Sequence, residues 1–363
     1  MKNDPDHGRV KRCFTPVSII KSIKNPEGNR NITFDVLRGI AILCVVFTHL
    51  PGVSLRFNFV FWWCYAFVIN MAVPVFMILM GYCAVMSAEK HNLSPWELYS
   101  PKNIVRKFRR YFFPWFPVIL LEILSVILGT NDYTAESLFY LFITGGYGPG
   151  SYYIPILFQF VLVFPVLFFC RKNILLCSFL INFLFEVAVH YFQISGEFYR
   201  LCILRYMFLL GLGMKMYYAQ ETVYSKRFQL LITGCGIFYL LYMTFFLDFG
   251  RSYPYWWGTF SLVGLYLYFP VRYVINSRIV EKLRPKIIVN ILACTGICSY
   301  HIFLVQMFYY SSAFYIFNYL KINSNIRYLL IALCAFPICI VAGCLYYHLE
   351  NVLVNTTGKK ASV

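Results

Sequence analysis

Three ionisable side chains, Asp35, Arg38 and His49, lie within an apolar stretch of the chain, residues 31–50 (NITFDVLRGIAILCVVFTHL). Imidazole is well suited to remove a proton near neutral pH, so His49 is a candidate general base for a weakly nucleophilic hydroxyl. The planar guanidinium of Arg38 suits a phosphate or a carboxylate. Ionisable groups within a membrane span face the bundle interior or a water-filled cavity and mark functional pathways. The stretch therefore predicts a functional path through the first span.

The spacing of these residues places them on one helical face. At about 100° per residue, Arg38 and His49 differ by roughly 20°, and Asp35 and His49 by about 40°. Along the axis, Arg38 and His49 are separated by about 16 Å. Anchoring at the two membrane interfaces is the alternative interpretation, but anchors need no shared face. Because Asp35 and Arg38 lie about three turns from His49, any group that orients its ring must come from another helix.

A basic run forms a second candidate site. It consists of Arg106, Lys107, Arg109 and Arg110. Such a cluster can bind phosphate groups. It can equally serve only to set membrane topology. Both interpretations stay open from the residues themselves.

The elements that must position these residues are membrane helices. The chain of 363 residues is 60% hydrophobic and only 13% charged, against about 25% charged in soluble domains. Apolar runs of about 20 residues recur along it. We expect an all-α integral membrane protein with about ten transmembrane helices. Their expected positions are 34–50, 60–87, 112–129, 151–169, 174–192, 200–218, 229–248, 254–274, 288–312 and 326–348. The apolar segment 138–145 is too short to span and is expected to be re-entrant or interfacial.

The distribution of positive charge predicts the orientation. With a cytoplasmic N-terminus and alternating sides, 25 of the 32 Lys and Arg residues fall on the cytoplasmic side and five on the opposite side, as the positive-inside rule requires. This pattern accounts for the net charge of +17 without nucleic acid and places both termini in the cytoplasm. The predicted organisation is a basic arm (1–31) near lipid headgroups, a membrane domain (32–350) and a short cytoplasmic tail (351–363).

The 13 cysteines show no Cys-x-x-Cys pair and no Cys/His ligand spacing. We interpret them as small apolar residues and predict no bound metal.

Six segments in order resemble the membrane acyltransferase 3 family, which includes O-antigen and peptidoglycan O-acetyltransferases. FDVLRGIAILCVVFTHL is similar to its first-span motif, a basic residue and a His separated by ten residues, here Arg38 and His49. The others are PVFMILMGYCAV (74–85, with Gly81), RKFRRYFFPWF (106–116), SYYIPILFQFVLVFPVL (151–167, with Tyr152 and Tyr153), SYHIFLVQ (299–306, with Ser299 and Gln306) and YYHLENV (346–352). The resemblance covers nearly the whole chain.

The resemblance implies acyl transfer, usually of acetyl from acetyl-CoA, to a sugar hydroxyl of a cell-surface polysaccharide or its lipid-linked precursor. It implies a bacterial plasma membrane, acyl-CoA as co-substrate and no bound cofactor. Arg106, Arg109 and Arg110 are then candidates for binding the CoA phosphates, and Tyr152, Tyr153, Gly81, Ser299 and Gln306 are candidates for the acceptor site or pocket. Gly81 and Ser299 also suit helix packing, and the tyrosines an interfacial belt.

The chain departs from the family pattern at several positions. Gln306 stands where many members carry a second His, and His301 lies about 140° away around the same helix. Met80, the Tyr152–Tyr153 pair and Asn351–Val352 also replace usual residues. The chain therefore lacks the second His of the family pattern.

Two other classes of function remain open. A transporter or flippase for a glycan intermediate would also use a polar stripe. Transporters more often show inverted repeats and broken spans, and no clear repeat is present. A non-catalytic assembly partner is the third class. The enzyme is favoured by the combination of Arg38, His49 and a cytoplasmic basic run.

Overall fold

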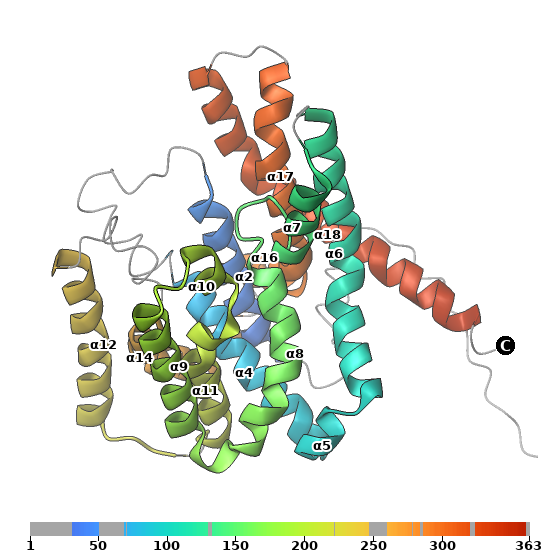
Figure 1. The fold of residues 1–363 in the computed structure, drawn as a ribbon. Coiled ribbons are helices and arrows are strands. Elements are labelled where there is room, and N and C mark those ends of the chain that lie inside the picture. Colours follow the sequence, from blue (N-terminus) through green and yellow to red (C-terminus); the bar gives the residue numbers. More distant parts are fainter. Residues whose placement is uncertain are drawn as a thin grey trace, which may run out of the picture.

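The computed structural model describes residues 31–50, 69, 71–129, 133–220, 222–246, 260–277, 279–283, 286–319 and 324–360. Every regular element in these ranges is a helix, and the ranges contain no strand (Figure 1). In chain order the helices are α2 (Ile32–Thr48), α4 (Ala72–Lys90), α5 (Pro95–Leu98), α6 (Pro101–Gly129), α7 (Ala135–Thr144), α8 (Tyr153–Phe169), η2 (Arg171–Asn173), α9 (Ile174–Tyr191), α10 (Gly196–Leu201), η3 (Ile203–Tyr206), α11 (Met207–Tyr218), α12 (Lys226–Phe246), α14 (Phe260–Asn276), α15 (Ile279–Leu283), α16 (Ile287–Ile297), α17 (Ser299–Tyr319) and α18 (Ser324–Lys360).

Four helical segments of the described chain are long and apolar enough to cross a membrane: Ala72–Lys90, Pro101–Leu128, Arg171–Tyr191 and Ile326–Val354. A fifth is obtained if the bent pair α16 and α17 forms one span. The predicted all-helical, multi-pass membrane architecture is therefore confirmed in this coarser form. The short apolar segment expected at 138–145 lies in α7, a helix of ten residues.

Two predicted helices differ from the structure. The helix predicted at 288–312 is bent by 72° at Cys298, where α16 ends and α17 begins. The helix predicted at 200–218 is divided into the end of α10, the turn η3 and α11. The chain after residue 350 continues as helix to Lys360, and the short cytoplasmic tail at 351–363 stays a prediction. The predicted arm up to residue 30 and residues 60–68 of the second predicted helix lie outside the described residues.

Two close helix crossings organise the centre of the molecule. At the first, Gly39 of α2 lies against the backbone of Leu292 in α16, and Gly296 lies against the backbone of Asp35. At the second, Gly81 of α4 faces the backbone of Leu210 in α11, and Gly213 faces that of Ile78. Small residues allow such approach between membrane helices. Gly81 therefore packs two helices together, as its alternative interpretation predicts.

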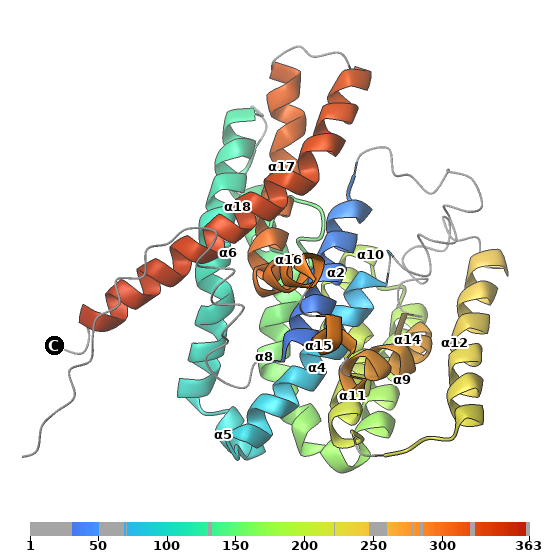
Figure 2. The same ribbon diagram turned by 180° about the vertical axis from the view of Figure 1, so that it is seen from behind.

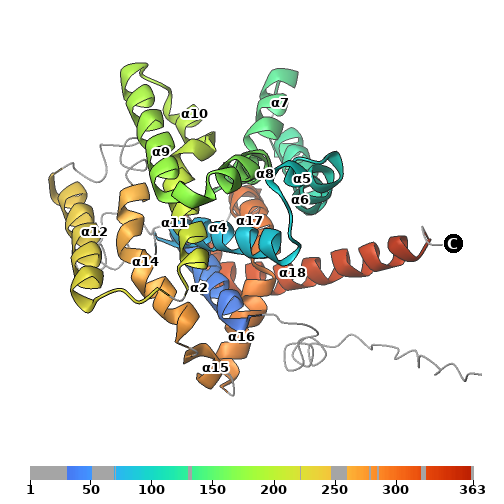
Figure 3. The same ribbon diagram turned by 90° about the horizontal axis from the view of Figure 1, so that it is seen from below.

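The remaining helices surround this centre. Figures 2 and 3 show α2 and α4 near the middle, with α12 on one margin, where it packs on α14. On the opposite side α17 packs along α18 and α6. The C-terminal turns of α18 project away from the other helices in all three views.

Candidate functional site

A cavity of about 920 Å³ lies between α2, α4, α6, α8 and the junction of α16 with α17. Asp35, Arg38 and His49 all line it. The shared face predicted from their helical spacing thus faces one continuous space. Because α2 rises by about 1.5 Å per residue, the cavity extends along the helix for about three turns between Arg38 and His49.

Arg38 is held at one position in this cavity by two contacts. Its Nη1 lies 3.7 Å from Oδ1 of Asp35, and its Nη2 donates a hydrogen bond of 3.1 Å to Sγ of Cys83 on α4. The Asp35 side chain is only 5% exposed, whereas that of Arg38 is 31% exposed. Asp35 therefore contacts the guanidinium on its buried side. The exposed part of the guanidinium can bind an anion in the cavity.

The basic run of α6 contributes three of its four cations to the cavity. Arg106, Lys107 and Arg110 line it, whereas the exposed Arg109 does not. Positions 106 and 110 are one turn apart on a helix and share a face, which explains why both residues line the cavity. Of the three residues predicted to bind the CoA phosphates, Arg106 and Arg110 thus line the cavity with Lys107, Arg109 does not, and phosphate binding stays a prediction.

A glycine-rich loop, residues 145–150 (GGYGPG), lies beside His49. Gly150 adopts a φ of +89°, a region that L-residues rarely adopt. A Cβ atom placed on it would lie 3.5 Å from Nε2 of His49 and 3.1 Å from the ring of Phe303. The backbone of the loop therefore forms the surface against which the imidazole packs. The His49 ring also meets Tyr310 edge-on, with 6.3 Å between ring centroids.

Three side chains from two other helices hold this loop. On α6, Nε1 of Trp115 donates to the carbonyl of Gly145 at 2.9 Å, and Oε2 of Glu122 accepts from the backbone N–H of Tyr147 at 2.9 Å. On α17, Nε2 of Gln306 donates to the carbonyl of Pro149 at 3.1 Å. These contacts fix the loop beside His49, while the prediction that a group from another helix orients the His49 ring itself stays a prediction.

Gln306 lies behind the loop and does not line the cavity. It is fully buried, and its Oε1 has no hydrogen-bond partner within the described chain. Gly81 is likewise absent from the cavity lining, since it packs at the crossing of α4 with α11. These two candidate pocket residues therefore act on the site only through the elements that they position.

The other candidate pocket residues, Tyr152, Tyr153 and Ser299, line the cavity. The ring of Tyr153 lies between Phe76 and Phe303, with centroid distances of 6.4 and 5.3 Å. Such a packed ring offers one fixed wall to a ligand.

Arg200 and Arg205 also line the cavity, although neither is among the site residues predicted from the sequence. Arg200 lies over the ring of Tyr152 at 5.6 Å, and Arg205 contacts the rings of Tyr199 and Tyr206 at 4.8 and 4.6 Å. Both come from the interrupted segment at α10 and η3. The break in this predicted span is seen only in the structure, and polar residues next to a broken membrane helix commonly line a binding site.

The lining thus combines six cations with one carboxylate, that of Asp35, among the described residues. The cations are Arg38, Arg106, Lys107, Arg110, Arg200 and Arg205. Such a cavity favours an anionic ligand. With the imidazole of His49 at its far end from the basic run, it offers both an anion-binding surface and a group that can exchange a proton.

Comparison with curated proteins and with solved structures found no match to the chain. The family model described as Acyltransferase domain matches residues 31–347, which includes every residue that lines the cavity. This match confirms the resemblance drawn from the six sequence segments. Membership implies an enzyme with an acyl donor and an acyl acceptor, and the chain belongs to the acyltransferase 3 family.

Proposed function

We propose that this protein transfers an acyl group, most simply acetyl, from acyl-CoA to a sugar hydroxyl of a cell-surface polysaccharide or its lipid-linked precursor. The observation that carries the proposal is one cavity that holds His49 together with the α6 cations Arg106, Lys107 and Arg110. In the proposed orientation the protein crosses a bacterial plasma membrane ten times, with both termini in the cytoplasm.

The donor would bind with its phosphates at the basic run of α6. Arg106 and Arg110 can each approach a phosphate with a fork of N–H donors, and Lys107 adds a point charge. Arg38 lies in the same cavity, held by Asp35 and Cys83. The narrow pantetheine arm would then run along the lined face of α2 and bring the thioester toward His49.

His49 would act as the general base. It takes the proton of the sugar hydroxyl as the hydroxyl oxygen attacks the thioester carbonyl carbon. A new C–O bond forms and the C–S bond breaks. The sulfur leaves as the thiolate of CoA, which recovers a proton from the imidazolium or from water. This direct transfer needs no acyl-enzyme.

The acceptor would bind at the wall formed by Tyr152, Tyr153, Ser299 and the two arginines of the interrupted segment. A sugar ring has an apolar face that can pack on a tyrosine ring. Arg200, placed over Tyr152, can meet a carboxylate of the sugar or a phosphate of a lipid-linked precursor.

Transfer of label from acetyl-CoA to a crude cell-envelope glycan, with the full chain in nanodiscs, tests the proposal. The wild type and a His190→Gln control, altered at an exposed histidine on α9, should transfer label at equal rates. His49→Gln should lose at least about 100-fold, within the usual range for removal of a general base. Equal transfer by His49→Gln would refute the assigned base. Absence of transfer by the wild type from any acyl-CoA would favour export of a glycan intermediate.

A further inference from the structure

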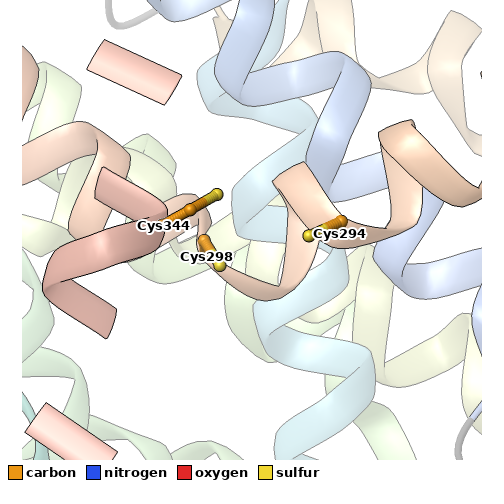
Figure 4. Close-up of side chains that lie close together, drawn as sticks. All are labelled: Cys294, Cys298 and Cys344. Carbon is orange, nitrogen blue, oxygen red and sulfur yellow. The ribbon is translucent and has the colours of Figure 1, made fainter. Parts of the chain in front are cut away.

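Three cysteines meet at the bend between α16 and α17. Their Sγ atoms all lie within 4.8 Å of one another. Cys294 belongs to the last turn of α16, Cys298 is the residue at the break, and Cys344 comes from α18. Figure 4 shows the three side chains close together, with Cys344 on α18 and Cys294 and Cys298 at the end of α16 and the bend that follows it. The sequence spacing alone predicts no such group, because Cys344 lies far along the chain from the other two.

The backbone keeps the first two thiols on one face. The N–H of Cys298 donates to the carbonyl of Cys294 at 3.1 Å, which preserves one helical turn between them. Gly343, next to Cys344, lies against the backbone of Ile302, so α18 approaches α17 closely at this level. The convergence therefore rests on a helical turn and on a close helix contact.

The donor set selects a class of metal. The group contains sulfur ligands only, with no carboxylate or imidazole among the described residues that join it. Soft thiolate ligands favour Zn(II) and Cu(I) over hard cations such as Mg(II). A Zn–S bond is about 2.3 Å long, so sulfurs around one ion lie about 4 Å apart. Contraction of less than about 1 Å would bring the three sulfurs to that separation.

We propose that Cys294, Cys298 and Cys344 form a binding site for one thiophilic d10 cation, Zn(II) or Cu(I). Each thiol that binds the ion forms a metal–sulfur bond and releases its proton to water. No electron is transferred, and no other reactant is needed. The site has three protein ligands and therefore leaves a position that a water molecule or a small thiol can occupy.

The ion would fix one wall of the cavity. Residues on both sides of the break, Ile297 and Ser299, line the cavity, as does Tyr347 one turn beyond Cys344. Gly296 lies directly against the backbone of Asp35. Joining α16, the bend and α18 through one ion would therefore hold this wall in register with the polar face of α2. Binding itself does not depend on the proposed acyl transfer.

The test is a metal titration of the full chain in nanodiscs, reduced beforehand and free of acyl substrate. Zn(II) and Cu(I) are added separately against a chelator of known affinity, and bound metal is counted by mass spectrometry. Co(II) serves as a spectroscopic probe, because thiolate coordination gives charge-transfer absorption in the near ultraviolet. The wild type should bind one equivalent of at least one of the two ions and should melt at a higher temperature when loaded.

Cys298→Ser and Cys344→Ser should each lose at least tenfold in affinity for the ion. Cys235→Ser, altered at an exposed cysteine on α12, is the matched control and should keep it. Cys298→Ala provides a second variant that adds no hydroxyl if the serine variant does not fold. Unchanged binding in the Cys298 and Cys344 variants would overturn the proposal. So would absence of stoichiometric binding by the wild type, or a disulfide among the three thiols that forms in preference to the metal complex.

Discussion

Replacement of Gln306 by leucine should lower turnover without lowering stability. The amide of Gln306 donates one hydrogen bond to the carbonyl of Pro149, while its buried Oε1 has no partner in the described chain. Loss of the hydrogen bond costs about 1 kcal/mol, and removal of an unsatisfied buried acceptor returns about 1–3 kcal/mol. Leucine has a similar volume. The two terms offset each other, so the free energy of unfolding should stay equal or rise slightly.

Turnover, in contrast to stability, should fall in the Gln306→Leu variant. Without the contact from Gln306, the 145–150 loop loses one of its holds, and Gly150 is less firmly placed beside His49. About 1 kcal/mol lost from the productive arrangement corresponds to a fivefold drop in kcat. The KM for acyl-CoA should not change, because the proposed phosphate site lies on α6 at the other end of the cavity.

Initial rates in nanodiscs and a thermal melt measure the two effects. Gln306→Asn is the contrasting variant, because the shorter amide cannot reach Pro149 and still buries both polar groups. It should lose both turnover and stability. Gln229→Leu on α12, where the amide donates to the carbonyl of Tyr224, is the matched control and should leave kcat unchanged. A kcat within twofold of wild type for Gln306→Leu would show that Gln306 does not position the loop. A joint fall in kcat and stability would assign Gln306 to the fold alone.

Three further predictions follow from individual contacts. Gly150→Ala should lower kcat about tenfold, since a positive φ disfavours alanine by about 1–2 kcal/mol and the added Cβ would press on Phe303. An unchanged kcat and pH–rate profile would contradict the role of Gly150 beside His49. Arg110→Gln should raise the KM for acyl-CoA about three- to tenfold, whereas Arg109→Gln should leave the KM unchanged. Equal effects of the two substitutions on steady-state kinetics would contradict a phosphate site that includes Arg110 and excludes Arg109. Gly39→Ala should destabilise the protein by about 1–3 kcal/mol, because its Cβ would meet the backbone of Leu292. Gly234→Ala on α12, with open space around it, should stabilise the protein by about 1 kcal/mol. Thermal unfolding in nanodiscs compares the two variants, and a stabilised Gly39→Ala would be inconsistent with the close crossing of α2 and α16.

The parts of the site that the sequence predicts are those set by local helix geometry. Asp35, Arg38 and His49 share a face because a helix turns by about 100° per residue, and that relation survives in any membrane environment. The same argument separates Arg109 from its neighbours on α6, although composition alone treats the basic run as one unit.

The parts that the sequence does not predict depend on contacts between distant segments. Arg205 enters the cavity because the chain breaks at η3, and apolar periodicity cannot indicate where a span is interrupted. The bend at Cys298 has no proline at the break, and the flanking Gly296 and Ser299 are a weaker signal that also fits an unbroken membrane helix. The meeting of Cys344 with Cys298 follows from the packing of α18 on α17, a tertiary relation.

The absence of a second histidine at position 306 is consistent with the proposed reaction. His301 is the nearest alternative on α17, but its Nε2 lies 2.6 Å from Oε2 of Glu350, and it does not line the cavity. A general acid is most needed when the leaving group is strongly basic. In the proposed reaction the leaving group is a thiolate, and because a thiol has a pKa of about 8.5, the thiolate can depart unprotonated. One base is then sufficient, and position 306 is free to carry an amide that holds the loop beside it.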